Sequence, residues 1–355
     1  MSDRARQLVL RYGWNSMAYQ ILNPGMAHWF APDGAGVVGY APAGRVWVVA
    51  GAPICAPERL EETALAYEAE ARRHSCRVCY FGAQDRLAEA LAPHGPLARL
   101  LLGAQPVWRP GRWPEIVAGK ASLRAQLARA RNKRVTVAAF PPGSRPDVGA
   151  LRRCLAEWLA GRGLPPMHFL IEPETLGALD DRWVFIARRA GEMVGFLVAT
   201  PIPQRAGWLI EQIIRGRSAP NGTAELLVDS AMRAFAELGS EYVTLGLAPL
   251  SRRANGAETV PSPLVRMALA WVRAHGRRFY NFVGLDAFKA KLQPDFWEPI
   301  YALSHERRTS LRTLYAIGGA FGGAAPPIFI ARGLARAAAQ ELRWLRQRVG
   351  RAFAK

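Results

Sequence analysis

The stretch LIEQIIRGRSAPNGTAELL, residues 209–227, contains the unit from which the fold of the second half can be inferred. Leucine and isoleucine residues on both sides of Glu211 and Gln212 indicate a buried strand. Glycine, proline and asparagine residues between 216 and 222 indicate a turn, and Thr223 begins a segment typical of a helix. Because a helix begins with unpaired backbone N–H groups and the positive end of its dipole, this turn is a candidate anion-binding site.

The segments around this unit follow a regular order. In the second half we expect strands at 183–187, 192–198, 207–214, 242–247 and 278–283, and helices at 147–161, 223–238 and 263–274. Three strands followed by helix, strand, helix and strand is the order of the acyltransferase fold of the GNAT type. A rough version occurs in the first half, with strands at 37–40, 46–50, 77–81, 100–102 and 106–108 and helices at 57–73, 84–91 and 122–134. We therefore predict an α/β (α+β) protein with tandem GNAT-like modules, in which mixed central sheets are flanked by helices.

A proline-rich break at 141–146 is the clearest linker in the chain. It separates an N-terminal GNAT-like module, 1–140, from a catalytic module, 147–305, and a basic tail, 306–355. The tail includes a basic amphipathic helix at 332–351, which is typical either of membrane-surface binding or of a solvated helix packed on the core. The uncharged run at 313–331 contains four glycines and two adjacent prolines, so we expect a bent interfacial segment rather than a membrane-spanning helix.

The chain carries 47 Lys and Arg residues against 28 Asp and Glu, a formal net charge of +19. Such an excess predicts anionic partners, either nucleic acid, lipid headgroups or both. A genome that favours arginine over lysine is the alternative explanation, but it accounts poorly for the excess over acidic residues. Cys76 and Cys79 would point to opposite sides of a strand, and no histidine cluster has metal-ligand spacing. We therefore expect no metal site.

A second stretch, GLDAFKAKLQPDFWEPIY at 284–301, mixes two lysines and three carboxylates with four aromatic residues. A core segment would not carry Lys289 and Lys291 so close to Phe288, and a solvated loop would not carry so many rings. The mixture suits the wall of a site that holds an anion against an apolar surface. The alternatives are that the lysines form a solvated strand face and that Trp297 belongs to the core.

This second stretch resembles the Phe-Lys-x-Lys-Phe-x-Pro-x-Trp-Glu-Pro-Arg-Tyr signature of the phosphatidylglycerol aminoacyltransferase (lysyltransferase) family. Members of that family form the cytoplasmic domain of the multiple peptide resistance factor. The turn is similar to the family's Asp-Leu-Met-Arg, Pro-Asn-Gly and acid pattern, and 243–250 is similar to its Leu-Gly-x-Ala-Pro-Leu strand. The resemblance covers about residues 9–305. It departs from the family in three places: Gln212 stands where the family has Asp, Ile300 replaces an Arg, and one extra residue precedes Trp297.

The resemblance implies transfer of an amino acid from aminoacyl-tRNA to a hydroxyl of phosphatidylglycerol or a similar membrane lipid. Exchange of one ester for another needs no cofactor, because aminoacyl-tRNA is the co-substrate. The implied partners are charged tRNA and an anionic membrane lipid, and the implied location is the inner face of the cytoplasmic membrane. Such a reaction lowers the attraction of the membrane for cationic antimicrobial peptides. We expect a stand-alone form, with a separate flippase or membrane protein as a further partner.

The candidate site residues come from both stretches. Four residues apart on a strand, Glu211 and Arg215 would share a face, with Gln212 on the opposite face. Glu211 could hold the α-ammonium group of the amino acid, while Arg215 and the lysines hold phosphates and the turn N–H groups stabilise an oxyanion. The alternative is a structural Glu211–Arg215 ion pair, and the general base stays open among Glu211, Glu225 and the substrate amine. The proposed catalytic residues are Glu211 and Arg215, and the proposed substrate-binding residues are Asn221, Gly222, Glu225, Lys289, Lys291, Trp297 and Glu298.

Two other functions fit parts of the sequence. One is a GNAT-type acyltransferase that uses an acyl thioester, but residues 215–220 do not form the Arg/Gln-x-x-Gly-x-Gly/Ala turn that cradles the coenzyme A pyrophosphate. The other is a basic protein that binds RNA or membranes without catalysis. Loss of activity in a Glu211→Ala variant would argue against the second, because binding driven by overall charge does not depend on one buried acid.

Overall fold

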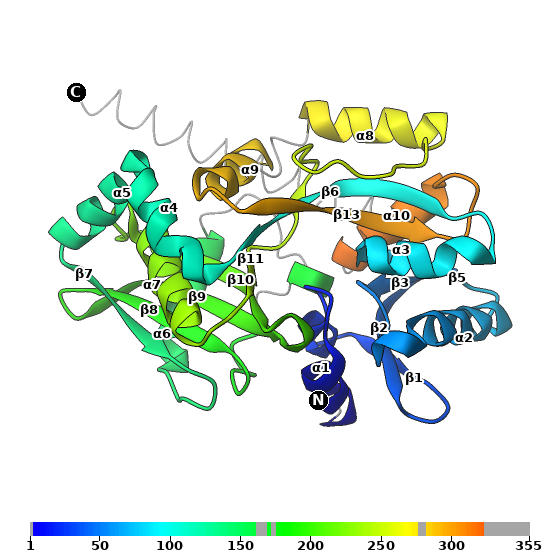
Figure 1. The fold of residues 1–355 in the computed structure, drawn as a ribbon, viewed down its shortest axis with the longest axis horizontal. Helices are drawn as coiled ribbons and strands as arrows, with labels where there is room; N and C mark the ends of the chain where they lie inside the picture. The colour runs from blue at the N-terminus through cyan, green and yellow to red at the C-terminus, as the bar shows by residue number, and fades with distance from the viewer. Residues whose placement is uncertain (1–2, 161–168, 172–174, 276–281, 323–355) are drawn as a thin grey trace, which may run out of the picture.

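The computed structural model describes residues 3–160, 169–171, 175–275 and 282–322 (Figure 1). Within these residues, 13 strands form one mixed sheet. In sheet order the path runs β1 (Ala27–Phe30), β2 (Gly36–Ala43), β3 (Val46–Ala50), β5 (Arg77–Ala83), β13 (Phe296–Ser304), β6 (Ala98–Trp108), β11 (Tyr242–Thr244), β10 (Gly207–Arg215), β9 (Glu192–Ile202), β8 (Trp183–Arg189) and β7 (Val135–Phe140). Two short strands lie off this path: β4 (Ile54–Cys55) pairs with β2, and β12 (Ala248–Pro249) pairs with β6.

The two halves of the chain meet at the centre of this sheet. Strand β13, near the end of the described chain, lies between β5 and β6 and is antiparallel to both. On its other edge β6 pairs with β11, which belongs to the second half. The expectation of two central sheets is therefore wrong in one respect, because the halves share a single continuous sheet. The mixed character is as expected, since β3–β5 and β10–β11 are parallel and the other pairs are antiparallel.

Helices cover both faces of the sheet because the strands of each half alternate apolar side chains between the two faces. On the side of the sheet that holds β1 to β5, α1 (Asp3–Tyr12) and α10 (Leu311–Gly322) pack on the face that carries Val48, whereas α2 (Leu60–Arg73) and α3 (Asp85–Leu91) pack on the face that carries Val49. On the side of the sheet that holds β7 to β11, α4 (Trp113–Gly119), α5 (Ala121–Asn132) and α7 (Thr223–Glu237) cover one face and α6 (Val148–Ala160) covers the other. Helices α8 (Pro263–His275) and α9 (Phe282–Lys291) lie along the side of β6 and β13 in Figure 1.

The structure differs from the sequence-based predictions in several local segments. The two lysines of the second stretch lie in helix α9, so the expected strand over 278–283 is wrong at its described end, Phe282 and Val283. The aromatic residues that follow form β13, which the sequence pattern did not reveal. Strand β7, just before the break at 141–146, pairs with β8, which comes after the break and beyond α6. The expected helix at 332–351 lies outside the described residues, and no helix within the described part of the chain is long and apolar enough to cross a bilayer.

Candidate active site

Strand β10 carries a β-bulge at the first predicted catalytic residue. Ile210 pairs with Ala199 and Gln212 pairs with Val198, so Glu211 is the extra residue between them. A bulge changes the alternation of side chains along its strand. Gln212 donates to Thr175 Oγ1 at 3.3 Å, and Glu211 accepts from Arg182 at 3.2 Å. The expectation that Glu211 and Gln212 face opposite sides is therefore wrong, because both contact the segment 175–182.

The bulge also separates the two predicted catalytic residues. Beyond it, Ile214 joins the apolar cluster under α6, so Arg215 points to the other face of the sheet. Arg215 is exposed at the end of β10, where it pairs in register with Gly195. The expected same-face relation of Glu211 and Arg215 is wrong, and the structural ion pair between them is excluded with it. Arg215 stays available for a phosphate at the surface.

Glu211 is a buried carboxylate with one oxygen still available. Its Oε2 accepts from Arg182 Nε at 3.2 Å, and the two side chains are only 7% and 3% exposed. Its Oε1 is buried and has no hydrogen-bond partner among the residues that the structure describes. The guanidinium of Arg182 also lies 4.7 Å from the centre of the Tyr19 ring. Arg182 occupies only Oε2, so Oε1 is the atom that Glu211 can offer to a cationic group.

The turn after β10 leads into α7, and at Gly222 it leaves no space for a side chain. Gly222 begins the helix with a φ of +93°, and a Cβ atom there would lie 2.1 Å from the carbonyl oxygen of Gln126 in α5. Asn221 is exposed beside it. In the first turn of α7, the buried Glu225 accepts from Lys291 Nζ of α9 at 2.8 Å. The structure thus brings Glu225 and Lys291 together, with the lysine side chain 29% exposed.

Lys289 has a different setting from Lys291. Its ammonium donates to the carbonyl oxygens of Leu245, Gly246 and Leu247 at 2.7, 2.8 and 2.9 Å. These carbonyls follow β11 directly, where the pairing with β10 has ended at Leu209 and Thr244. Burial lowers the pKa of Lys289 to about 7, and the nearby negative charge of Asp286 opposes part of this shift. All three donors are used within the chain, so the predicted phosphate contact is not available to this residue.

Glu298 joins the two halves of the sheet. Its Oε2 accepts from Gln84, Gln105 and Tyr242 at 2.8, 2.9 and 2.8 Å. Arg205 donates to both carboxylate oxygens, at 2.6 Å to Oε1 and 3.2 Å to Oε2. We call these five residues the seam cluster, because their elements lie on both sides of the contact between β13, β6 and β11. Burial and the charge of Glu298 hold the pKa of Tyr242 well above its ordinary value, so the phenol stays a donor.

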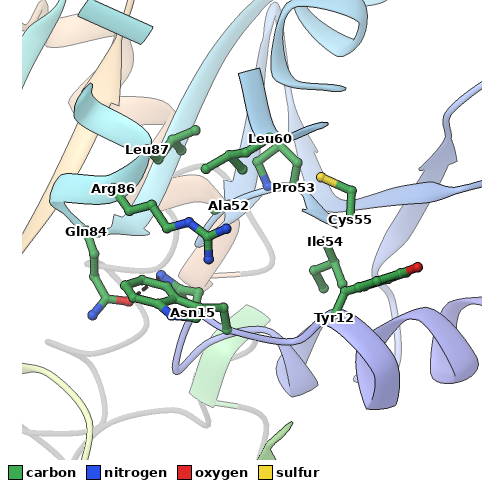
Figure 2. A pocket seen from close by; sticks show the side chains of 11 residues that line it. Tyr12, Asn15, Ala52, Pro53, Ile54, Cys55, Leu60, Gln84, Arg86 and Leu87 are labelled. Atoms are coloured by element: carbon green, nitrogen blue, oxygen red, sulfur yellow. Dashed lines mark hydrogen bonds between the residues drawn. The ribbon is translucent and has the colours of Figure 1, made fainter. Parts of the chain in front are cut away.

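A pocket opens beside the seam cluster in the first half (Figure 2). Gln84 lines the pocket and accepts from Asn15 at 3.0 Å. The ring of Trp14 lies under two guanidinium groups, 4.6 Å from that of Arg205 and 5.0 Å from that of Arg86. The pocket therefore contacts the cluster that holds the two halves together.

Trp297 lies one residue before Glu298 on β13 and is partly exposed. The guanidinium of Arg253 lies 5.4 Å from the centre of its ring and donates to Asp286 at 2.9 Å. The ring is thus covered by a cation on the surface of the second half. It belongs neither to the core nor to the pocket of Figure 2.

The sequence patterns missed Arg182, Arg205, Tyr242 and Arg86. Arg182 follows two aspartates and Arg205 lies in a short 3₁₀ turn (Pro203–Arg205), so both resemble ordinary surface residues. Only their contacts with buried carboxylates distinguish them. Tyr12 and Gly51-Ala52-Pro53 are weaker marks of the family resemblance, and Tyr12, Ala52 and Pro53 line the pocket.

Comparisons with known proteins agree with this architecture. The model of the family "Phosphatidylglycerol lysyltransferase, C-terminal" matches residues 6–304. Among solved structures, the C-terminal domain of a lysylphosphatidylglycerol synthetase from Agrobacterium fabrum is 24% identical, with a TM-score of 0.76 over 90% of this chain and 96% of that one. The L-PGS structure from Bacillus licheniformis is 21% identical, with the same TM-score over 90% of this chain and 95% of that one. A FemX structure is 10% identical, with a TM-score of 0.54 over 85% and 97% of the two chains.

No curated protein sequence shows significant similarity to the chain. The solved structures confirm the predicted α/β fold, with its mixed sheet flanked by helices. The family match covers most of the chain and agrees with the motifs of both stretches. The chain therefore belongs to the phosphatidylglycerol lysyltransferase C-terminal family, and it is an aminoacyltransferase of the kind that aminoacylates lipids.

Proposed function

We propose that the chain transfers the aminoacyl group of an aminoacyl-tRNA to a hydroxyl of phosphatidylglycerol or a similar anionic lipid. The observation that carries the proposal is the buried carboxylate of Glu211, whose Oε1 lacks a partner among the described residues. An aminoacyl ester brings an α-ammonium group, which would complete this oxygen with a charge-assisted hydrogen bond. Glu211 would thus hold the amino acid through Oε1 while Arg182 holds its other oxygen.

The reaction exchanges one ester for another. The lipid hydroxyl oxygen attacks the ester carbonyl carbon, the bond from that carbon to the ribose oxygen breaks, and the hydroxyl proton ends on the ribose oxygen. No electron is gained or lost, so we propose that no cofactor is required. Glu298 is saturated by donors, and an α-ammonium group held by Glu211 has no lone pair to accept the proton. The candidate bases that remain are Glu211, through Oε1, and Glu225.

Exposed basic residues support tRNA as the donor. Arg215 and Arg217 lie at the surface on the turn that precedes α7. Arg129, Lys133 and Arg134 are exposed on and just after α5, which packs against the beginning of α7 through Gln126. These residues form a positive surface around the turn, as phosphate contacts require. Each lost phosphate contact should weaken tRNA binding and reduce its salt dependence.

Exposed apolar residues support contact with a membrane. Val260, Leu264 and Met267, in and just before α8, are 60%, 55% and 66% exposed, whereas Val265 of the same helix is buried. Helix α10, which contacts α8, exposes Leu311 and Tyr315 next to basic residues. An apolar helix face flanked by positive charge suits the surface of an anionic bilayer. We propose peripheral binding to the cytoplasmic face of the membrane through this surface.

The decisive test supplies the purified chain with charged tRNA and phosphatidylglycerol vesicles and measures aminoacylated lipid by mass spectrometry. Glu211→Gln removes the charge with little change of shape, and Glu237→Gln is the matched control at an exposed position near the end of α7. We expect product from the wild type and from Glu237→Gln, and a loss of at least tenfold in Glu211→Gln at unchanged melting temperature. Equal product from both variants would exclude the assigned role of Glu211.

The same assay separates the alternative functions. Product formed from an acyl thioester but not from charged tRNA would favour the thioester-dependent acyltransferase. Binding of tRNA and vesicles without any product would favour a binding protein, provided that the protein is folded.

A further inference from the structure

A basic groove lies where the end of α2, the beginning of β5 and the loop after β13 meet. The antiparallel pairing of β5 with β13 brings these segments together, where the orange chain leaves β13 in Figure 1. Four arginines line the groove: Arg72 of α2, Arg77 of β5, and Arg307 and Arg308 of the loop. The groove is open to solvent and has a volume of about 900 Å³, which is the size of a ligand site.

The acids of the groove compensate little of this charge. Glu68 and Glu306 also line it, but their side chains are only 8% and 12% exposed. Glu68 contacts His305 at 2.7 Å, and Glu306 accepts from Thr313 at 2.6 Å. In the part of the chain that the structure describes, Arg77 alone of the four arginines lies within ion-pair distance of either acid, 3.9 Å from Glu306.

The arginines are exposed and have donors to spare. The Arg77 side chain is 60% exposed, and the other three arginines are exposed as well. Among the described residues, no carboxylate or carbonyl accepts a hydrogen bond from Arg72, Arg307 or Arg308. The planar donor fork of a guanidinium group matches a pair of phosphate oxygens. The groove is therefore suited to bind a phosphate group.

The neighbourhood of the groove indicates what carries the phosphate. The loop that contains Arg307 and Arg308 leads directly into α10, which exposes Leu311 and Tyr315 and contacts α8. The groove thus adjoins the apolar surface for which we propose membrane contact. Its described lining contains no phenylalanine, tyrosine or tryptophan ring on which a nucleic acid base could stack. An anionic lipid bilayer fits this combination better than RNA does.

The groove is also distant from the group that we propose to hold the amino acid. Glu298 and Ser304, at the groove, are six residues apart on β13, which is about 20 Å of strand. Glu211 lies on β10, three strands away from β13 in the sheet. A molecule whose phosphate is held in the groove is therefore too far from Glu211 to exchange an ester there.

We propose that the basic groove binds the headgroup phosphate of an anionic phospholipid that does not react, and that it thereby orients the chain on the bilayer. The guanidinium groups hold the phosphate, while the exposed side chains of α8 and α10 lie in the interface. This inference rests on the proposed function for membrane contact. It goes beyond that function by assigning a second lipid site, separate from the acceptor.

The test measures binding of the full chain to mixed phosphatidylglycerol–phosphatidylcholine vesicles by sedimentation. The variant Arg72→Gln/Arg308→Gln removes one arginine from each side of the groove. The matched control, Arg145→Gln/Arg153→Gln, removes two exposed arginines at the break and in α6. We expect the groove variant to bind about 10- to 100-fold more weakly, and the control to bind as the wild type does. Arg72→Lys/Arg308→Lys keeps the charge without the fork and should fall between them.

Four outcomes would overturn the proposal. Unchanged vesicle binding by the Arg72→Gln/Arg308→Gln variant would show that the groove is not a lipid site. Equal weakening in this variant and the control, or full binding by the lysine variant, would indicate general charge attraction. Loss of tRNA binding with unchanged vesicle binding would assign the groove to RNA. Calorimetry provides the fourth outcome: if inorganic phosphate binds as tightly as dihexanoylphosphatidylglycerol, with the same dependence on Arg72 and Arg308, the groove takes a free anion.

Activity measurements separate this proposal from the proposed function. Dihexanoylphosphatidylglycerol, used as dissolved monomer, needs no bilayer, so Arg72→Gln/Arg308→Gln should lose far more product with vesicles than with the dissolved lipid. An equal loss with both, at unchanged melting temperature, would place a reacting substrate in the groove and overturn the assignment. Product from the wild type with unaltered vesicle binding in the variant would reject the groove and keep the reaction. Weakened vesicle binding in the variant, without product from any form of the chain, would keep the groove and reject the reaction.

Discussion

Replacing Lys289 by methionine should destabilise the protein far more than the same change at Lys291, although both lysines lie in α9. Lys289 is 3% exposed and donates to three carbonyl oxygens that follow β11. Methionine keeps most of the shape of the side chain and removes all three hydrogen bonds. Lys291 makes one ion pair, with Glu225 at 2.8 Å, and is partly exposed.

The expected loss of stability depends on which buried groups each substitution leaves without a hydrogen-bond partner. Each buried carbonyl left without a donor costs about 1–3 kcal/mol. The desolvation of the ammonium, several kcal/mol, no longer opposes folding in the variant and offsets part of that sum. The net loss for Lys289→Met should be about 3–5 kcal/mol, the range for removing one partner of a buried charged arrangement. For Lys291→Met, a partly exposed pair predicts about 1 kcal/mol or less.

Urea unfolding followed by tryptophan fluorescence and by circular dichroism measures both variants against the wild type. A loss of 3–5 kcal/mol is a large share of the 5–15 kcal/mol typical of folded proteins, so Lys289→Met should have a clearly lower midpoint. A loss no larger than that of Lys291→Met would refute the reasoning. It would mean that the three carbonyls are satisfied by water or by a local shift, and Lys289 would again be a candidate phosphate ligand.

Three further predictions concern other parts of the structure. Gly222→Ala should destabilise by about 1–3 kcal/mol, measured by urea unfolding, because the backbone has a positive φ and a Cβ atom would collide with Gln126. Tyr242→Phe should cost about 1–3 kcal/mol in the same assay, because it removes two buried hydrogen bonds, one of them to the carboxylate of Glu298. The contact of His305 with Glu68 at 2.7 Å raises the pKa of the histidine above that of the unfolded chain. Its stabilisation is therefore present below about pH 6.5 and is lost as the pH rises through the native pKa, so the melting-temperature advantage over His305→Gln should shrink from about pH 6 to pH 8.

The order of strands and helices could largely be predicted because each segment carries its own apolar period. The hairpin of β8 and β9, strand β10 and helix α7 all lie close to their expected positions. Strand β13 was missed because its apolar residues are mixed with Glu298 and Pro299, and its partners are distant in the sequence. The periodicity of a segment does not show which strands it will join.

For a related reason, the sequence could not predict on which face of the sheet each residue of the candidate site lies. Side chains along 209–215 would alternate between the two faces of the sheet only in a regular strand. A bulge forms where two residues of one strand lie opposite one residue of its partner, and the partner is not evident from the segment itself. Strand β9 offers Ala199 and Val198 to Ile210 and Gln212, which leaves Glu211 as the extra residue. Gln212, at the family's Asp position, and the neighbouring Glu211 therefore both contact the segment 175–182, although adjacent residues of a regular strand would face opposite sides. The carboxylate of Glu211 can therefore lie on the same face as Gln212, the residue that stands at the family's Asp position.

The seam cluster changes how the Trp-Glu-Pro part of the family signature should be understood. A catalytic carboxylate needs a free oxygen, but Glu298 accepts from four side chains that come from four different segments. It joins β13 to β6 and β11 at the point where the two halves of the sheet meet, and it holds Arg205 over Trp14 beside the pocket. Glu211, by contrast, keeps one buried oxygen for a ligand. The motif most characteristic of the family in this sequence thus assembles the two halves, and the group better suited to hold the amino acid lies on a bulge outside that motif.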